Sequence, residues 1–296
     1  MLRRTTSSRD KQAIAANRLF SPGVLSKIAK NRGFDEFVSL CNQTGFNYGL
    51  ETNAVIADAF DFAFAKLRKS GVRSEYIYKS ALTHNVLLGM HSLSTASIAT
   101  EFRVGKSKAD VVIFNGTSTA YEIKSDRDNL SRLMGQIADY RKVFARNFVI
   151  CSPSHLQEVE AELPSDVGIL LLSRWNRIST HREARSDFSN FCAHTMFSSL
   201  ATSDAREVLK RCGVGVPQVP NTRLRRVMWD EFSDLDVQEL HHAMVHVLKS
   251  SHSKQCLKSI LQSFPKSVMP AVVNMRLRRL ERENLSEAMR KPFASL

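Results

Sequence analysis

The spacing of hydrophobic positions changes along the chain and divides it into regions. Within residues 24–89, apolar side chains recur every three or four positions, which is typical of helices with one buried face. The spacing predicts two short helices in 24–41, one helix over 54–69 and one over 75–89. The first 20 residues are polar and basic and have no period, so we expect a flexible tail there.

Short apolar, β-branched runs replace the helical period between residues 97 and 175. Asn115-Gly116 separates the second run from the third and is the strongest short-range signal for a hairpin in the chain. Helical spacing returns at 126–145, where Ser125 and Asp128 fit a capping box, and again at 153–163. The order of elements predicts a mixed α/β sheet core flanked by helices. The predicted strands are 99–104, 109–114, 119–124, 148–151 and 168–172.

From residue 176 onward the pattern is helical and rich in loops, and prolines separate its segments. The whole chain is therefore predicted to contain four parts. These are a flexible basic tail (1–20), a helical N-terminal region (21–96), the α/β core (97–175), and a helical C-terminal region (176–296) that could bind nucleic acid or a partner.

Charge is distributed unevenly around this predicted core. The 296 residues carry 42 Lys and Arg against 29 Asp and Glu, a formal net charge of +13. Residues 1–32 hold eight basic residues and one acid, whereas 97–175 is balanced, with ten of each sign. Basic flanks around a neutral centre favour a polyanionic partner, for which we expect DNA, with RNA not excluded. Further basic clusters comprise Arg206, Lys210, Arg211, Arg223, Arg225 and Arg226.

The cysteines, the apolar runs and the first residues bear on the cellular compartment in which we expect the protein. The five cysteines are scattered and form no C-x-x-C pair, so neither a disulfide framework nor a structural zinc site is expected. The longest apolar runs, such as 167–172, are far shorter than the ~20 residues of a membrane span. The first ten residues carry charge with no apolar segment behind it. We therefore expect a cytoplasmic protein with no membrane partner, and the sequence leaves a homodimer open.

The predicted hairpin brings two acidic residues together. If Asn115–Thr117 forms a three-residue loop, Asp110 lies opposite Glu122, and a loop one residue shorter or longer still places it beside Glu122. Paired residues have Cβ atoms roughly 4.5–5.5 Å apart, so these carboxylates repel unless a cation lies between them. Lys124 follows two positions later on the same face. Asp, Glu and Lys on one face suit a divalent ion and phosphodiester hydrolysis.

These residues resemble the signature of the PD-(D/E)xK nuclease superfamily. The match consists of Ala109-Asp110, Glu122-Ile-Lys124 and, in the following helix, Gln136-x-x-x-Tyr140, which is similar to the helix of RecB-like branches. The longer run resembles an uncharacterised bacterial and phage-associated branch. The resemblance implies a restriction-endonuclease-like fold, Mg²⁺ (or Mn²⁺ as a substitute), and cleavage of DNA in a defence, mobile-element or repair setting.

The resemblance also implies roles for individual residues. Asp110 and Glu122 would hold the metal, assisted by the Ile123 carbonyl and by a fourth acid, for which Glu101 is the first candidate and Glu75 the second. Lys124 would orient or activate the attacking water. The predicted nucleic-acid contacts are Gln136 and Arg132 to phosphate, Tyr140 to a base or sugar, and Lys106 and Lys108 to phosphate.

Two other classes of function remain open at this point. The chain could be a nucleic-acid-binding module on a nuclease core that has lost activity, or an interaction protein whose basic flanks bind an acidic partner. Zinc catalysis is disfavoured, because His242 and His246 have the spacing of a zinc pair but no adjacent Glu and no third ligand. A helix that buries Leu240, Met244 and Val247 explains that segment instead.

Overall fold

The computed structural model describes residues 8–46, 53–69, 74–85, 96–126, 128–173, 177–216, 218–251, 263–273, 275 and 277–296. The chain divides into two compact units. Unit 1 consists of residues 1–83 and 256–296, and unit 2 of residues 84–255. The predicted C-terminal region, residues 176–296, is therefore divided between the two units. Its part up to residue 255 belongs to unit 2 and its part from residue 256 belongs to unit 1, which corrects the prediction of a single region there.

Unit 1 is helical, as the spacing of its apolar residues predicts. Its core is aromatic: the Phe20 ring lies 5.5 Å from that of Phe60, and Phe37 lies 5.8 Å from Phe293. The C-terminal segment closes this core, since Phe293 N–H donates to the Ala54 carbonyl at 2.7 Å. The helices are α1 (Ser8–Leu19), α2 (Pro22–Ala29), α3 (Phe34–Thr44), α4 (Ile56–Lys69), α5 (Glu75–Leu82), α13 (Met269–Val273), α14 (Arg279–Ala288) and η4 (Phe293–Ser295).

The predicted flexible tail is wrong from residue 8 onward. Residues 8–19 form α1, and its Ala15, Ala16 and Leu19 are buried against unit 1. Small apolar residues at this spacing pack closely on a neighbouring helix, although the many charged residues around them hide the period. Residues 1–7 lie outside the described residues.

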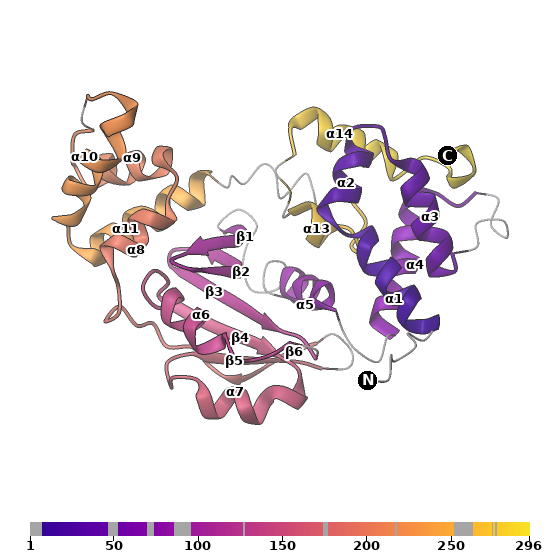
Figure 1. The fold of residues 1–296 in the computed structure, drawn as a ribbon, viewed down its shortest axis with the longest axis horizontal. Helices are drawn as coiled ribbons and strands as arrows, with labels where there is room; N and C mark the ends of the chain where they lie inside the picture. The colour runs from indigo at the N-terminus through magenta and orange to yellow at the C-terminus, as the bar shows by residue number, and fades with distance from the viewer. Residues whose placement is uncertain are drawn as a thin grey trace, which may run out of the picture. The chain divides into compact units, whose positions relative to one another are not determined.

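Unit 2 contains a six-stranded mixed sheet with strands in chain order, β1 to β6 (Figure 1). The first three strands are antiparallel, β3–β4 and β4–β5 are parallel, and β6 is antiparallel to β5. This confirms the predicted mixed α/β class with flanking helices. The strands are β1 (Ser97–Val104), β2 (Ser107–Phe114), β3 (Ser118–Lys124), β4 (Arg146–Cys151), β5 (Gly168–Leu172) and β6 (Ile178–Arg182).

Two elements of unit 2 differ from the prediction. Strand β6 is a polar edge strand with exposed positions, so it has no apolar pattern to reveal it. The helix predicted over 126–145 shortens to α6 (Leu133–Tyr140). Ser125 N–H and Oγ both donate to the Asp128 carboxylate, at 2.7 and 2.6 Å, so this pair closes a turn ahead of the helix rather than capping it.

One face of the sheet and the surrounding helices share a single hydrophobic core. Val112, Phe114 and Ala120 of the sheet belong to the same buried cluster as Leu133 and Ile137 of α6. The cluster continues into the helices that follow β6. The helices and the short turn of unit 2 beyond α6 are η3 (Pro153–His155), α7 (Leu156–Glu162), α8 (Ala193–Ser199), α9 (Thr202–Arg211), α10 (Asn221–Ser233) and α11 (Val237–Ser251). None of the helices described here is long and apolar enough to cross a membrane.

Candidate metal and catalytic site

The hairpin register is the one that a three-residue loop requires. Val111 pairs with Tyr121 and Phe114 with Ser118, and Asn115 N–H donates across the loop to the Thr117 carbonyl at 2.9 Å. Continuing this register places Asp110 of β2 opposite Glu122 of β3, as predicted. Gly116 at the tip has φ 71°, which suits glycine and explains the Asn-Gly signal.

Glu101 has an unusual backbone conformation opposite Asp110. In β1, Thr100 pairs with Val111 and Phe102 with Ala109, so the same register brings Glu101 to Asp110. Glu101 has φ 52°, in the left-handed region that residues other than glycine rarely adopt. Such a conformation costs on the order of 1–3 kcal/mol and is characteristic of functional sites. The surrounding structure therefore maintains an acidic residue in a strained position beside a second acid.

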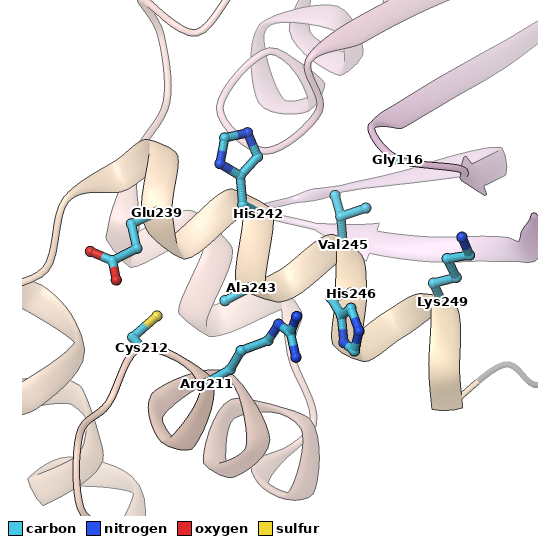
Figure 2. A pocket seen from close by; sticks show the side chains of 9 residues that line it. All are labelled: Gly116, Arg211, Cys212, Glu239, His242, Ala243, Val245, His246 and Lys249. Carbon is cyan, nitrogen blue, oxygen red and sulfur yellow. The ribbon is translucent and has the colours of Figure 1, made fainter.

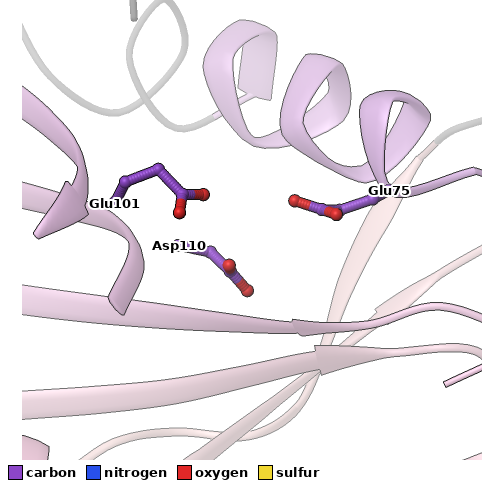
Figure 3. A group of neighbouring side chains, drawn as sticks. All are labelled: Glu75, Glu101 and Asp110. Atoms are coloured by element: carbon purple, nitrogen blue, oxygen red, sulfur yellow. The ribbon is translucent and has the colours of Figure 1, made fainter. Parts of the chain in front are cut away.

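The carboxyl groups of Glu101 and Asp110 project from adjacent strands into one region (Figure 3). A carboxylate oxygen of Glu101 lies within 4.8 Å of one of Asp110. Lys108 Nζ lies 3.1 Å from Glu101 Oε2, and Ile123 N–H donates to Asp110 Oδ2 at 2.7 Å. Ile123 thus contributes its backbone N–H here, and its carbonyl as a metal ligand stays a prediction.

The second candidate for the fourth acid belongs to unit 1. Glu75 begins α5, and its carboxylate pairs with Lys79 Nζ at 2.7 Å. Its role as a metal ligand stays a prediction.

Glu122 and Lys124 form a buried pair next to the two acids. Lys124 Nζ lies 3.0 Å from Glu122 Oε1, and both side chains are almost fully buried. Gln136 of α6 binds both: its Nε2 donates to Glu122 Oε1 at 2.5 Å, and its Oε1 accepts from Lys124 Nζ at 2.8 Å. Strand alternation places Glu122 and Lys124 on the face that α6 covers, which is why one helix satisfies both charges.

Tyr140 completes this network from the next turn of α6. Its hydroxyl lies 2.7 Å from Glu122 Oε2 and 2.6 Å from the Lys108 carbonyl. A phenol has a single proton and can donate to one of these two acceptors at a time. Burial raises the pKa of Glu122 despite the opposing effects of Lys124, Tyr140 and Gln136. A protonated Glu122 would donate to Tyr140 and leave the phenolic proton for the Lys108 carbonyl, so both acceptors would be satisfied.

The predicted residues therefore lie in two adjacent groups. Glu101 and Asp110 are partly exposed to solvent and share one region, whereas Glu122 and Lys124 are buried against α6. Among the described residues, Glu122 does not belong to the group of mutually close carboxylates. In this conformation its oxygens bind hydrogen-bond donors of the chain itself. Oxygen ligands from Glu101 and Asp110 nevertheless have the chemistry that a hard divalent cation requires.

The predicted nucleic-acid contacts have mixed outcomes. Tyr140 is fully buried, so the prediction that it contacts a base or sugar is wrong for this conformation, because its ring packs in the core and its hydroxyl binds Glu122. The Gln136 amide is likewise engaged with Glu122 and Lys124 rather than open to phosphate. Arg132 precedes α6 at an exposed position, and Lys106 is exposed in the β1–β2 turn. Their phosphate contacts, and that of Lys108, stay predictions.

One residue of the predicted basic clusters, Arg225, has a structural role. Arg225 donates to the Phe197 and Leu200 carbonyls at 2.9 and 3.2 Å, and its guanidinium lies 4.5 Å from the Phe197 ring centroid. Arg225 therefore joins α10 to α8 and is not available to a polyanion. Arg223 and Arg226 on the same helix are exposed.

Asp139, which was not among the predicted site residues, positions the β1–β2 turn. Its Oδ2 accepts from Ser107 Oγ at 2.7 Å, and its carboxyl carbon lies 3.1 Å from where a Cβ on Gly105 would be. Gly105 has φ 57°, so glycine is required there both for the backbone and for this close approach. In the sequence, the one feature that could have indicated this role is the position of Asp139 directly before Tyr140 of the Q-x-x-x-Y helix.

The chain is similar to a protein of a bacteriophage and to one solved protein of unknown function. Protein cII of Enterobacteria phage P4 is 36% identical over 98 residues, which are 32% of this chain and 33% of that protein. The chain thus matches about a third of the length of this curated relative. A solved protein of unknown function from Silicibacter pomeroyi is 18% identical, with a TM-score of 0.30 over 45% of this chain and 86% of that protein.

The names of these two proteins state no activity. The family described as bacteriophage P4 protein cII matches residues 68–273, which include all the candidate site residues of unit 2 and Glu75. This match spans most of the chain, and the protein therefore belongs to the bacteriophage P4 protein cII family.

Proposed function

We propose that this protein is a metal-dependent nuclease that hydrolyses phosphodiester bonds of DNA, with Mg²⁺ as its metal and Mn²⁺ as a substitute. The observation that carries the proposal is the pair of close carboxylates on Glu101 and Asp110, maintained by a strained backbone beside the buried Lys124 and Glu122. Two acids that face one another repel unless a cation separates them. The arrangement therefore makes chemical sense as a cation site.

The donor set supports a hard cation. Asp110 and Glu101 would hold it, and Glu122 would join them once its side chain leaves the Tyr140 hydroxyl. When bound, a divalent ion lowers the pKa of a coordinated water molecule and stabilises negative charge on phosphate. Lys108, which lies 3.1 Å from Glu101, neutralises that acid in the present structure and is exposed enough to bind a phosphate oxygen instead.

Lys124 supplies the second electrostatic element. Glu122 and Gln136 bind its ammonium group from both sides, so its position is fixed before a substrate binds. A preorganised cation stabilises developing charge at no reorganisation cost, which is the basis of most electrostatic catalysis. Gln136, which binds both Glu122 and Lys124, and Tyr140, which binds Glu122, act as positioning residues.

Cleavage of plasmid and linear DNA by the purified chain, with Mg²⁺ and with a chelator, tests the proposal. We expect cleavage only with the metal, and its loss in Asp110→Asn. Lys124→Met should lower turnover about 100-fold or more, the scale of losing one electrostatic contributor. Glu158→Gln, which removes an exposed carboxylate on α7, is the matched control and should cleave like wild type.

Melting temperature provides a readout that does not depend on turnover. Mg²⁺ should raise it for wild type and for Glu158→Gln but not for Asp110→Asn, because a ligand that binds only the folded state stabilises it. Without metal, Asp110→Asn should melt at the same temperature or slightly higher, since its repulsion with Glu101 is relieved. No shift with millimolar Mg²⁺ in wild type, together with a lower melting temperature for Asp110→Asn, would refute the metal site.

A second candidate is a nucleic-acid-binding module built on an inactive core. The observation in its favour is that Glu122 already accepts three hydrogen bonds from Lys124, Gln136 and Tyr140, as a purely structural buried acid would. This function predicts salt-sensitive DNA binding with no cleavage under any metal. Membership of a phage P4 family is consistent with a mobile-element setting, and we propose the cytoplasm as the site of action.

A further inference from the structure

A pocket separate from the carboxylate site lies in unit 2, at the tip of the β2–β3 hairpin. It has a volume of about 420 Å³ and forms between the end of α9, one face of α11 and Gly116 (Figure 2). A Cβ on Gly116 would meet no atom within 4 Å, so the backbone at the tip is open to a ligand. None of these residues takes part in the carboxylate site.

The wall formed by α11 contains four polar side chains together with the apolar Ala243 and Val245. Glu239, His242, His246 and Lys249 all line the pocket, and their spacing of three, four and three residues places them on one helical face. Residues on the other face of the same helix, such as Met244, are buried in the core. The apolar face of α11 therefore packs against unit 2, while these four polar side chains line the pocket.

Positive charge dominates the pocket. Arg211 from the last turn of α9 and Lys249 from α11 both line it, and neither forms an ion pair with any acid in the described part of the chain. Glu239 is the one acidic side chain in the lining, and Figure 2 shows it beside Cys212 at the opposite end from Lys249. Two imidazoles, which can donate hydrogen bonds, stand between these ends.

The same side chains do not form a metal site. Within the described residues, His242, His246 and Cys212 belong to no group of three ligands whose atoms are mutually close. Burial and the nearby Glu239 raise the pKa of the Cys212 thiol, which disfavours the thiolate that zinc would need. Cationic side chains in the lining also disfavour a bound cation.

We propose that this pocket binds a phosphate group. The Arg211 guanidinium can bind two phosphate oxygens at once, Lys249 adds a point charge, and His246 adds a donor from the helix between them. The shared chemistry is a phosphate ester, supplied either by a nucleic-acid backbone or by a free nucleotide. The proposal concerns binding and does not depend on the cleavage proposed above.

The position of the pocket favours the nucleic-acid backbone as the source. Gly116 lies six positions after Asp110, and β2 extends as far as Phe114, so at 3.3 Å per residue the two places are at most about 20 Å apart. Duplex DNA advances 3.4 Å per base pair, so about six base pairs would span the two places. A duplex lying along the hairpin could therefore place one phosphate in the pocket and another at the carboxylates.

Binding measured by fluorescence anisotropy in the presence of a chelator tests the proposal without cleavage. The probes are a labelled 20-base-pair duplex and, separately, a labelled adenosine triphosphate. The test variant is Arg211→Gln with Lys249→Gln. The control, Lys210→Gln with Arg226→Gln, removes the same charge from exposed positions of the same helical region, and Lys210 there pairs with Glu207.

We expect the test variant to bind the duplex about tenfold more weakly, with a salt slope smaller by about 2, since each lost phosphate contact lowers it by roughly 0.9. The control should change affinity by less than half as much. A loss confined to the nucleotide would support the pocket with a free nucleotide as its ligand. If the test and control variants bind both probes equally well, the pocket is not a phosphate site.

Discussion

The substitution Lys124→Met tests the buried network directly. It replaces the ammonium with an apolar side chain of similar length and leaves the Glu122 carboxylate without its cation. The two groups lie 3.0 Å apart, and their side chains are 7% and 3% exposed. At an effective dielectric constant of about 20, their attraction is about 5–6 kcal/mol before desolvation is subtracted.

Breaking such a pair by removing one partner destabilises proteins by about 3–5 kcal/mol, because an uncompensated charge stays buried. We expect Lys124→Met to lose this much free energy of unfolding at pH 7, measured by urea denaturation. The double variant Glu122→Gln, Lys124→Met should recover most of the loss, since a neutral amide still bonds with Gln136 and Tyr140. Glu158→Gln is again the control for removing an exposed acid.

The effect should also depend on pH. Burial raises the pKa of Glu122 in wild type, and the loss of Lys124 raises it further. A carboxyl group with a raised pKa in the folded state binds its proton more tightly there, so stability is greater at low pH and falls as pH rises through that pKa. The deficit of Lys124→Met should therefore shrink on acidification. A loss below about 1 kcal/mol at pH 7, independent of pH, would refute the reasoning.

Three further predictions concern other parts of the chain. Burial lowers the pKa of His241 from 6.5 to about 4, so stability should fall by up to about 3 kcal/mol between pH 6.5 and 4, and His241→Gln should remove this component of a pH-dependent denaturation series. Glu101→Gly should be about 1 kcal/mol more stable to urea than Glu101→Ala, the reverse of the usual order in strands, because glycine relieves the strain at φ 52°. Leu19→Ala in α1 should lower the free energy of unfolding, measured with urea or heat, by about 2–5 kcal/mol. Ile14→Ala, at an exposed position of the same helix, should lower it little. Equal effects of the two substitutions would instead support a flexible N-terminal tail.

The sequence by itself determined most local elements and limited the hairpin to three neighbouring registers. Asn115-Gly116 specified a short turn, and each of these registers placed Asp110 opposite or beside Glu122, with Lys124 on the same face of its strand; the structure selected the register of the three-residue loop. Apolar periodicity located most helices and the buried strands. These features depend on turn conformation, strand alternation and helical periodicity, which are set by residues near one another in the chain.

Tertiary structure decided the features that depend on distant segments. The polar edge strand β6 forms because β5 offers backbone partners, and α1 is ordered because α3 and α4 cover its small apolar residues. Tyr140 and Gln136, expected to face nucleic acid, instead turn inward because Glu122 and Lys124 lie beneath α6 and need partners when buried. Arg225 bonds with carbonyls of α8 for the same reason. The strain at Glu101 and the pocket between α9, α11 and the hairpin tip arise only when these separate elements pack together, which no local pattern encodes.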